Sequence, residues 1–265
     1  MLLDGRVVRD NILSDLKNKL SKINKKLCFV VICVDNNDIS DIYIRSKEKM
    51  ALELGYEIII EKLDNNITND ELINVIDKYN DDDSVNGIMI ELPLPSSIDY
   101  NLVKNRINPL KDIEGVNNSK IISPVVMAVM DMLEYYDIDI FHKNIVIIGR
   151  SNLIGMPLYD LLVSKKANVK LCHSNTDNLI GYTRDADILI SCVGKAHFIT
   201  GDMIKEGSIV IDIGTNMVDD KLCGDVDFDS VCDKVSYITP VPLGIGQITP
   251  IELGVNIYKC YKNIE

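Results

Sequence analysis

Apolar runs of strand length alternate with helix-length amphipathic segments along almost the whole chain, and this alternation constrains the fold more than any other feature. The first run, Leu27–Val34, is apolar at every position, as expected of a strand that is buried on both faces. Strands of this kind, separated by helices, predict parallel sheets that are covered by helices on both sides. The sequence therefore predicts an α/β protein.

The same alternation continues to the end of the chain. The expected strands are Leu27–Val34, Glu57–Leu63, Gly87–Glu91, Asn144–Ile148, Val169–Cys172, Ile188–Cys192 and Ile209–Ile213. The expected helices are Asp10–Ile23, Asp41–Leu54, Asn69–Tyr79, Tyr100–Ile107, Val125–Tyr136, Pro157–Ser164 and Pro250–Tyr261. We expect Ser40 to cap the second helix, and Thr68 with Glu71 to form a capping box for the third. The pattern restarts after Asn108–Ser123, which we expect to join two α/β domains.

Composition excludes several classes of partner. The chain has 265 residues, with 28 basic and 40 acidic side chains and a formal charge of −12, so its surface repels nucleic acid and anionic lipid. No run reaches the roughly 18 apolar residues of a membrane span, and the charged first 20 residues do not resemble a signal peptide. The 7 cysteines are odd in number and none are spaced C-x-x-C, which favours reduced thiols in the cytoplasm. The three histidines form no cluster in sequence, and we expect no metal site.

A glycine-bounded turn connects a buried strand to a helix in residues 144–157, NIVIIGRSNLIGMP. The strand ends at Gly149, the chain turns through polar residues to Gly155, and Pro157 suits the first turn of a helix. Such a turn directs backbone N–H groups and a helix N-terminus toward a phosphate. The spacing is not G-x-G-x-x-G, so an ordinary strand–helix turn remains the alternative interpretation.

The end of the following strand indicates which dinucleotide is preferred. NAD-binding sheets usually carry Asp or Glu at this place, to bind the ribose 2′-hydroxyl. Here Cys172 is followed by His173, Ser174, Asn175 and Thr176. Arg150 and Ser174 can instead donate hydrogen bonds to a 2′-phosphate, so we expect NADP rather than NAD.

Candidate chemical groups occur in four further segments. Tyr43 and Lys47 are four residues apart on an expected helix, so they share one of its faces. A lysine can transfer protons near neutral pH when burial lowers its pKa, although any amphipathic helix can carry such a Tyr–Lys pair by chance. Glu91 stands at the carboxyl end of a buried strand, where open α/β sheets bind their ligands. The other two segments are Lys111–Gly115 at the domain junction and the stiff loop Thr239–Gly246.

Eight segments, in order and spacing, give the chain a specific resemblance to a known family. They read SDIYIRSK, GIMIELPLP, KDIEG, IIGRSNLIGMP, CHSNT, VIDIGTN, GDVDF and TPVPLGIG. With these segments the chain resembles the bifunctional methylenetetrahydrofolate dehydrogenase/cyclohydrolase family along nearly its whole length. The resemblance implies oxidation of 5,10-methylenetetrahydrofolate with NADP, followed by hydrolysis of the methenyl product to 10-formyltetrahydrofolate.

The resemblance also implies an architecture and a set of site residues. The fold would be two α/β domains with a cleft between them: residues 1–117, completed by the C-terminal helix at 248–265, and a Rossmann-like NADP-binding domain at 118–247. Members of the family form homodimers, so the resemblance implies a homodimer here as well. By analogy Lys47 is the main catalytic group, Tyr43 lies against the folate, and Glu91 hydrogen-bonds Lys47. Glu114, Pro240, Val241 and Pro242 would bind the folate, and Gly149, Arg150, Ser151, Ser174 and Thr215 would bind NADP.

This chain departs from the family pattern at several positions. The family has Gln at the position of Glu91 and Asp at that of Glu114. The family segment P-C-T-P-x-G corresponds to Ser123–Val129, SPVVMAV, and the loop after TPVP reads LGIGQ instead of GG-x-GP. An ionised Glu91 would favour the ammonium form of Lys47, and a pair sharing one proton is the other possibility. We therefore expect a cyclohydrolase step that is weaker, or has a shifted pH optimum, relative to the dehydrogenase step.

Three alternative functions stay open at this stage. The chain could be a monofunctional dehydrogenase with weak cyclohydrolase activity because of Glu91. It could be another two-domain NADP oxidoreductase that acts on a small hydroxy or keto acid, such as a shikimate-type substrate. It could also bind nucleotide or folate without turnover.

Overall fold

The computed structural model describes residues 1–34, 38–117 and 120–264, and the side chains within these ranges except those of residues 38–43 and 264. The chain forms two compact units, Met1–Asn11 with Val125–Thr249 and Ile12–Pro124 with Pro250–Glu265. We call the first the nucleotide unit and the second the lysine unit. The division differs from the expected one in two places, because residues 1–11 group with the nucleotide unit and the boundary expected after residue 117 falls after Pro124.

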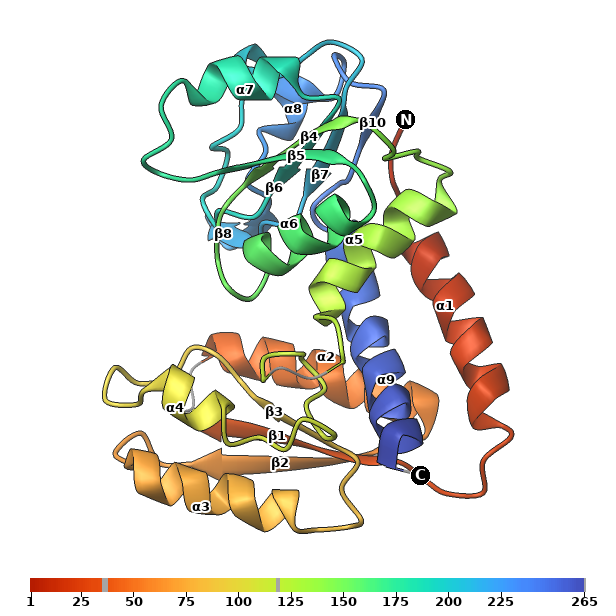
Figure 1. Cartoon of the computed structure of the whole chain (residues 1–265), viewed down its shortest axis with the longest axis vertical. Helices are drawn as coiled ribbons and strands as arrows, with labels where there is room; N and C mark the ends of the chain where they lie inside the picture. Colours follow the sequence, from red (N-terminus) through yellow and green to blue (C-terminus); the bar gives the residue numbers. More distant parts are fainter. Residues whose placement is uncertain (35–37, 118–119, 265) are drawn as a thin grey trace. The chain divides into compact units, whose positions relative to one another are not determined.

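The lysine unit contains a three-stranded parallel sheet with the order β2-β1-β3. Its strands are β1 (Cys28–Val34), β2 (Glu57–Leu63) and β3 (Gly87–Ile90). Its helices are the later part of α1 (Gly5–Leu20), α2 (Asp38–Leu54), α3 (Asn69–Asn80), α4 (Tyr100–Lys104) and most of α9 (Ile245–Ile264). Figure 1 shows α3 on one side of this sheet and α2 and α9 on the other.

Alternate residues of β1 face two separate apolar cores. Phe29 and Val31 pack with residues of α1, α2 and α9, whereas Val30 and Ile32 pack with residues of α3 and α4. All four side chains are fully buried. The sheet is therefore covered on both faces, as the uninterrupted apolar run predicts.

The nucleotide unit contains a five-stranded parallel sheet with the order β10-β7-β6-β4-β5. Its strands are β4 (Asn144–Ile148), β5 (Asn168–Cys172), β6 (Ile188–Ser191), β7 (Ile209–Asp212) and β10 (Tyr237–Ile238). The helices of this unit are α5 (Pro124–Tyr135), α6 (Gly155–Ser164), α7 (Leu179–Asp185), the 3₁₀ turn η1 (Gly201–Met203) and α8 (Phe228–Val231). β5 and β6 lie on opposite sides of β4, which is the strand-order reversal at which open α/β sheets bind ligands.

The expected strands are all present, with ends that differ by at most one residue. The Thr68–Glu71 capping box is also confirmed. Ser40 was wrong as a cap, because α2 begins at Asp38 and Ser40 lies inside it. Helices α1 and α9 begin five residues earlier than expected, and the structure adds α7, α8 and the hairpin of β8 (Asn216–Val218) and β9 (Lys221–Cys223). Among the residues described, no helix has the length and apolarity required to cross a membrane.

Candidate active site

A buried ion pair forms the chemical centre of the lysine unit. Lys47 Nζ donates a hydrogen bond to Glu91 Oε2 at 2.7 Å, and the two side chains are only 12% and 8% exposed. The two residues come from different elements, since Lys47 lies on α2 and Glu91 directly follows β3. The structure thus brings together two of the side chains that the sequence singles out.

The packing of α2 explains why Lys47 is buried. Ile44, Met50, Ala51 and Leu54 are buried members of the core, and they lie three, four or seven residues from Lys47. Lys47 therefore shares the apolar stripe of an amphipathic helix. Tyr43 belongs to the same helix, but its side chain lies outside the described part of the structure.

The segment Lys111–Gly115 runs beside β3 and carries Glu114 to the same edge of the sheet as Glu91. Ile88 of β3 forms a parallel bridge with Asp112, and the Ile88 N–H donates to the carbonyl of Lys111 at 2.7 Å. Because both segments run in the same direction, Glu91 and Glu114 follow at the same end.

Two residues of this segment hold it in place, and the sequence analysis gave neither of them a role. The fully buried Asp112 carboxylate accepts the N–H groups of Glu114 (3.1 Å), Gly115 (2.9 Å) and Asn117 (2.8 Å). The buried Lys111 ammonium donates to three carbonyls that follow helix α3 or end it, at 2.7–3.0 Å. A sequence signal existed, since an Asp two residues before a turn accepts such N–H groups.

Helix α9 also holds the loop that carries Glu114. Asn256 is fully buried on α9, and its Nδ2 donates to the carbonyls of Ile113 at 3.0 Å and Ile122 at 2.9 Å. The two carbonyls flank the loop that carries Glu114. No local pattern in the sequence marks Asn256, because its partners lie more than 130 residues earlier.

The pKa of Glu114 is raised to about 8, mainly by burial and also by the negative charges of Glu91 and Asp112, while the Lys47 ammonium partly opposes this rise. The side chain keeps a little exposed surface, but its carboxyl is enclosed by protein. At neutral pH Glu114 is therefore mostly a neutral acid beside an ion pair, which makes it a hydrogen-bond donor.

In the nucleotide unit, the turn after β4 is closely packed and depends on two glycines. Gly149 has φ +118°, and a Cβ there would lie 2.6 Å from the carbonyl oxygen of Cys192. A Cβ on Gly155 would collide with the carbonyl oxygen of Gly149. Helix α6 starts directly at Gly155, and its N-cap residue Ile154 offers no side-chain hydrogen bond to the first turn. The positive end of the helix dipole and the close backbone approach suit a bound phosphate.

The other expected nucleotide-binding residues lie at the same edge of the five-stranded sheet. Arg150 and Ser151 are exposed in the turn, and the Ser151 hydroxyl accepts the Ile154 N–H at 3.2 Å. Ser174 is exposed after β5, in a turn where His173 Nδ1 accepts the Asn175 N–H at 3.2 Å. His173 thus stabilises the turn after β5. Thr215 is exposed after β7. These residues, together with Gly149, surround the ends of β4, β5 and β7.

The loop Pro240–Leu243 also belongs to the nucleotide unit and follows β10. The peptide bond between Val241 and Pro242 is cis, and Leu243 has φ +89°. That φ favours glycine, and glycine is what the family pattern has at this position. Leu243 is thus held in a conformation that its side chain disfavours.

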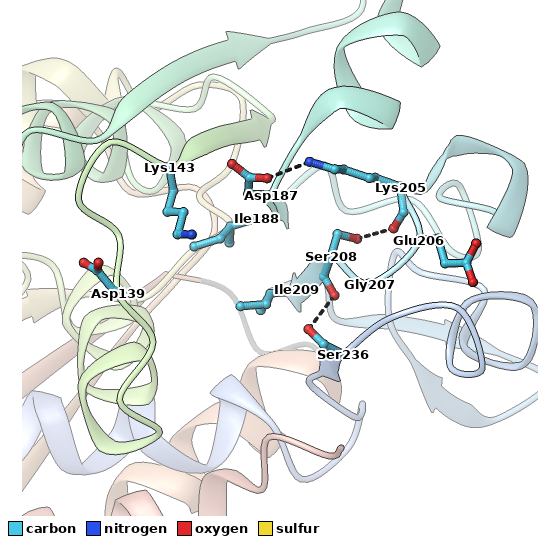
Figure 2. Close-up of a pocket in the computed structure, with 10 residues that line it drawn as sticks. All are labelled: Asp139, Lys143, Asp187, Ile188, Lys205, Glu206, Gly207, Ser208, Ile209 and Ser236. Atoms are coloured by element: carbon cyan, nitrogen blue, oxygen red, sulfur yellow. Dashed lines mark hydrogen bonds and ion pairs between the residues drawn. The ribbon is translucent and has the colours of Figure 1, made fainter.

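A polar pocket lies at the opposite edge of the same sheet (Figure 2). Its lining includes Asp187, Ile188, Ile209 and Ser236, which stand at or just before the amino ends of their strands. Lys205 Nζ forms an ion pair with Asp187 across it at 2.7 Å. Ligands of open α/β sheets bind at the carboxyl ends of strands, so this pocket is not the candidate site.

A two-unit α/β chain with a nucleotide-type turn in one unit and a buried Lys–Glu pair in the other defines a dinucleotide-dependent enzyme class. Two family profiles match it, namely the NAD(P)-binding domain of tetrahydrofolate dehydrogenase/cyclohydrolase over residues 123–265 and the catalytic domain over residues 3–114. The chain belongs to the tetrahydrofolate dehydrogenase/cyclohydrolase family.

Individual relatives cover nearly the whole chain. The bifunctional protein FolD of Clostridium novyi is 38% identical over 274 residues, covering 98% of this chain and 99% of the relative. That of Streptococcus uberis is 40% identical over 263 residues, covering 94% and 93%. The resemblance found from the sequence motifs is thereby confirmed.

Solved structures agree with this assignment. The bifunctional FolD enzyme of Campylobacter jejuni superposes with a TM-score of 0.96 at 38% identity, covering 100% of this chain and 99% of that one. The Trypanosoma brucei enzyme, described as complexed with NADP cofactor and inhibitor, has a TM-score of 0.94 at 29% identity, covering 100% and 98%. A shikimate 5-dehydrogenase of Listeria monocytogenes has a TM-score of only 0.54 at 11% identity, covering 92% and 98%, so it shares the fold alone.

The raised pKa of Glu114 predicts a pH-dependent stability. Between the ordinary value of 4.5 and about 8 the folded chain holds a proton that the unfolded chain releases, so the free energy of unfolding falls as pH rises. Replacing Glu114 by Gln removes this loss of stability, which is at most about 1.4 kcal/mol per pH unit. We expect the Tm of Glu114→Gln, relative to the native chain, to increase from pH 5.5 to 8 and then level off. The exposed Glu48→Gln is the control, and a pH-independent Tm difference for Glu114→Gln would contradict the prediction.

Proposed function

We propose that this chain oxidises 5,10-methylenetetrahydrofolate to the methenyl form with NADP and hydrolyses the product to 10-formyltetrahydrofolate. The observation that carries the proposal is the buried Lys47–Glu91 pair, at the positions where the family pattern has its catalytic Lys and its partner. Family membership over nearly the full chain supports both steps. A shikimate-type substrate is disfavoured, since that likeness is one of fold alone.

The residues at the carboxyl edge of the five-stranded sheet suit NADP. Gly149 and Ser151 would approach the pyrophosphate at the start of α6, where N–H groups and the helix dipole favour negative charge. Arg150 and Ser174 would bind the 2′-phosphate, and Thr215 would contact the cofactor after β7. NADP supplies the acceptor for the hydride that leaves the folate methylene carbon.

Lys47 and Glu91 would act on the folate. The oxidised folate carries a positive charge, so the Glu91 carboxylate favours its formation, and no protein base is needed for hydride loss. Hydrolysis requires proton transfers as water adds to the methenyl carbon and one C–N bond breaks. Lys47 is the group that holds a proton at this place, and its hydrogen bond to Glu91 fixes its direction.

Binding of the folate would use the groups around this pair. We propose that Glu114 contacts the donor edge of the pterin, that Tyr43 lies against its ring, and that Pro240, Val241 and Pro242 also contribute to folate binding. The pterin edge carries hydrogen-bond donors, which require an ionised carboxyl as their acceptor. Below about pH 8, binding of the pterin therefore releases the proton from Glu114.

We further propose a cytoplasmic homodimer. The β8–β9 hairpin exposes Met217, Val218 and Leu222, which provide apolar area for a second copy of the chain. All 7 cysteines are free thiols, in keeping with a reducing compartment. Sedimentation of the native chain as a monomer at micromolar concentration would refute the dimer.

A single mixing experiment tests the proposed reaction. NADP and methylenetetrahydrofolate are added to the full chain, and the absorbances of NADPH and of methenyltetrahydrofolate are followed together. We expect NADPH to form stoichiometrically with oxidised folate and the methenyl absorbance to rise and then decay. Tight NADP binding without NADPH formation would show a binding protein without turnover.

Glu91 sets the balance between the two steps. Glu91→Gln replaces the charge-assisted hydrogen bond that Lys47 donates at 2.7 Å by a weaker one to an uncharged amide, which restrains the lysine less during proton transfer. We expect the hydrolysis rate of this variant to rise about three- to tenfold near pH 7. The dehydrogenase rate should change less.

The control for this prediction is Glu57→Gln, which removes one partner of an exposed Lys–Glu pair, Lys26–Glu57. Both rates of that variant should match those of the native chain. Identical hydrolysis profiles for the native chain and Glu91→Gln would eliminate the proposed role of the Glu91 charge.

Arg150 is expected to select NADP over NAD. Loss of a charge-assisted hydrogen bond to a 2′-phosphate reduces kcat/KM for NADP about 10- to 100-fold in Arg150→Ala, while kcat/KM for NAD changes little. Lys165→Ala, an exposed substitution just after α6, serves as the control. An unchanged NADP-to-NAD ratio in Arg150→Ala would assign the selectivity to another residue.

A further inference from the structure

A second buried carboxylate belongs to Asp225. It accepts more hydrogen bonds than any side chain that we propose to take part in the reaction. It is fully buried, and its Oδ2 accepts the Ser191 hydroxyl at 2.9 Å and the N–H groups of Val193 at 2.8 Å and Gly194 at 3.3 Å. Its Oδ1 accepts the Lys195 N–H at 2.8 Å and the Asn216 side-chain amide at 3.1 Å. Three successive backbone N–H groups thus converge on one side chain.

These donors lie in two loops at the carboxyl edge of the five-stranded sheet. Residues 192–195 directly follow β6, and Asn216 follows Thr215 after β7. The first loop lies against the nucleotide turn, because a Cβ on Gly149 would lie 2.6 Å from the Cys192 carbonyl oxygen. The Cys192 thiol also donates to the carbonyl of Ile148 at 3.3 Å. Asp225 therefore holds the loop that follows β6, next to the strand-order reversal between β4 and β6.

Asp225 itself is fixed by another buried carboxylate. Asp212, at the end of β7, accepts the N–H groups of Gly214 at 2.8 Å, Asp225 at 3.1 Å and Val226 at 2.8 Å. The Asp212 N–H in turn donates to the Thr239 hydroxyl at 2.7 Å. A continuous hydrogen-bonded chain thus runs from the strand ends to loop 192–195.

We infer that Asp225 is a positioning residue for the dinucleotide, because its carboxylate fixes loop 192–195 and the Thr215–Asn216 segment in the geometry that binds the cofactor. This inference rests on the proposed NADP site. Asp225 touches no reacting atom and acts through the two loops. Its loss therefore affects the cofactor and leaves the groups of the lysine unit unchanged.

The test compares Asp225→Asn with the native full chain. The NH₂ group of Asn cannot accept, so two or three buried donors lose their partner, a loss that weakens NADP binding about 10- to 100-fold. We expect the Kd for NADP, measured by calorimetry without folate, and the KM for NADP to rise by this factor. The KM for methylenetetrahydrofolate should stay within about twofold. Asp229→Asn, an exposed neighbour on α8, is the matched control.

Two milder variants keep the inference testable if Asp225→Asn does not fold. Ser191→Ala and Asn216→Ala each remove one donor and leave the carboxylate, and each should raise the Kd for NADP about two- to fivefold. A lower Tm with unchanged NADP binding in the variants that fold would overturn the inference and leave Asp225 a stability residue. An equal rise of both KM values would also overturn it. Failure of the native chain to bind NADP would instead refute the proposed function.

Discussion

Burial of both faces of two parallel sheets is the constraint on which the rest of the structure depends. With helices over Phe29 and Val31 on one face and Val30 and Ile32 on the other, no polar chemistry can take place on the sheet surface. On the central strands β1, β3 and β4 the polar groups are confined to the strand ends, where Glu91 follows β3 and Gly149 follows β4. The position of both candidate sites is a consequence of this packing.

The loops at those ends are held by buried carboxylates rather than by apolar contacts. Asp112, Asp212 and Asp225 are at most 2% exposed, and each accepts at least three hydrogen bonds from backbone N–H groups. A carboxylate that is removed from water in this way is stabilised only while those donors remain in place. Each Asp therefore ties the conformation of a loop to the stability of its unit.

Much of the fold could be predicted from sequence, because apolar strands and capped helices leave local patterns. The capping box at Thr68 is such a pattern and is confirmed. The predicted start of a helix was wrong where a cap was assigned from residue type alone, as at Ser40, which lies inside α2. The Lys47–Glu91 contact could be anticipated only through the family resemblance, since 44 residues separate the pair. Asn256 was not noted at all, and Asp225 was noted only as part of the segment GDVDF with no role, because the roles of both depend on partners distant in sequence and leave no spacing signal.

The interleaving of the two units has a consequence for how the chain is made. The lysine unit consists of residues 12–124 and 250–265, and Asn256 binds the carbonyls beside the Glu114 loop only once α9 is present. During synthesis, the segment that carries Lys47 and Glu91 leaves the ribosome long before the helix that completes its core. The nucleotide unit, which needs only residues 1–11 and 125–249, can assemble first. The lysine unit can therefore complete its core only after α9 has been synthesised, although most of its residues come from the first half of the chain.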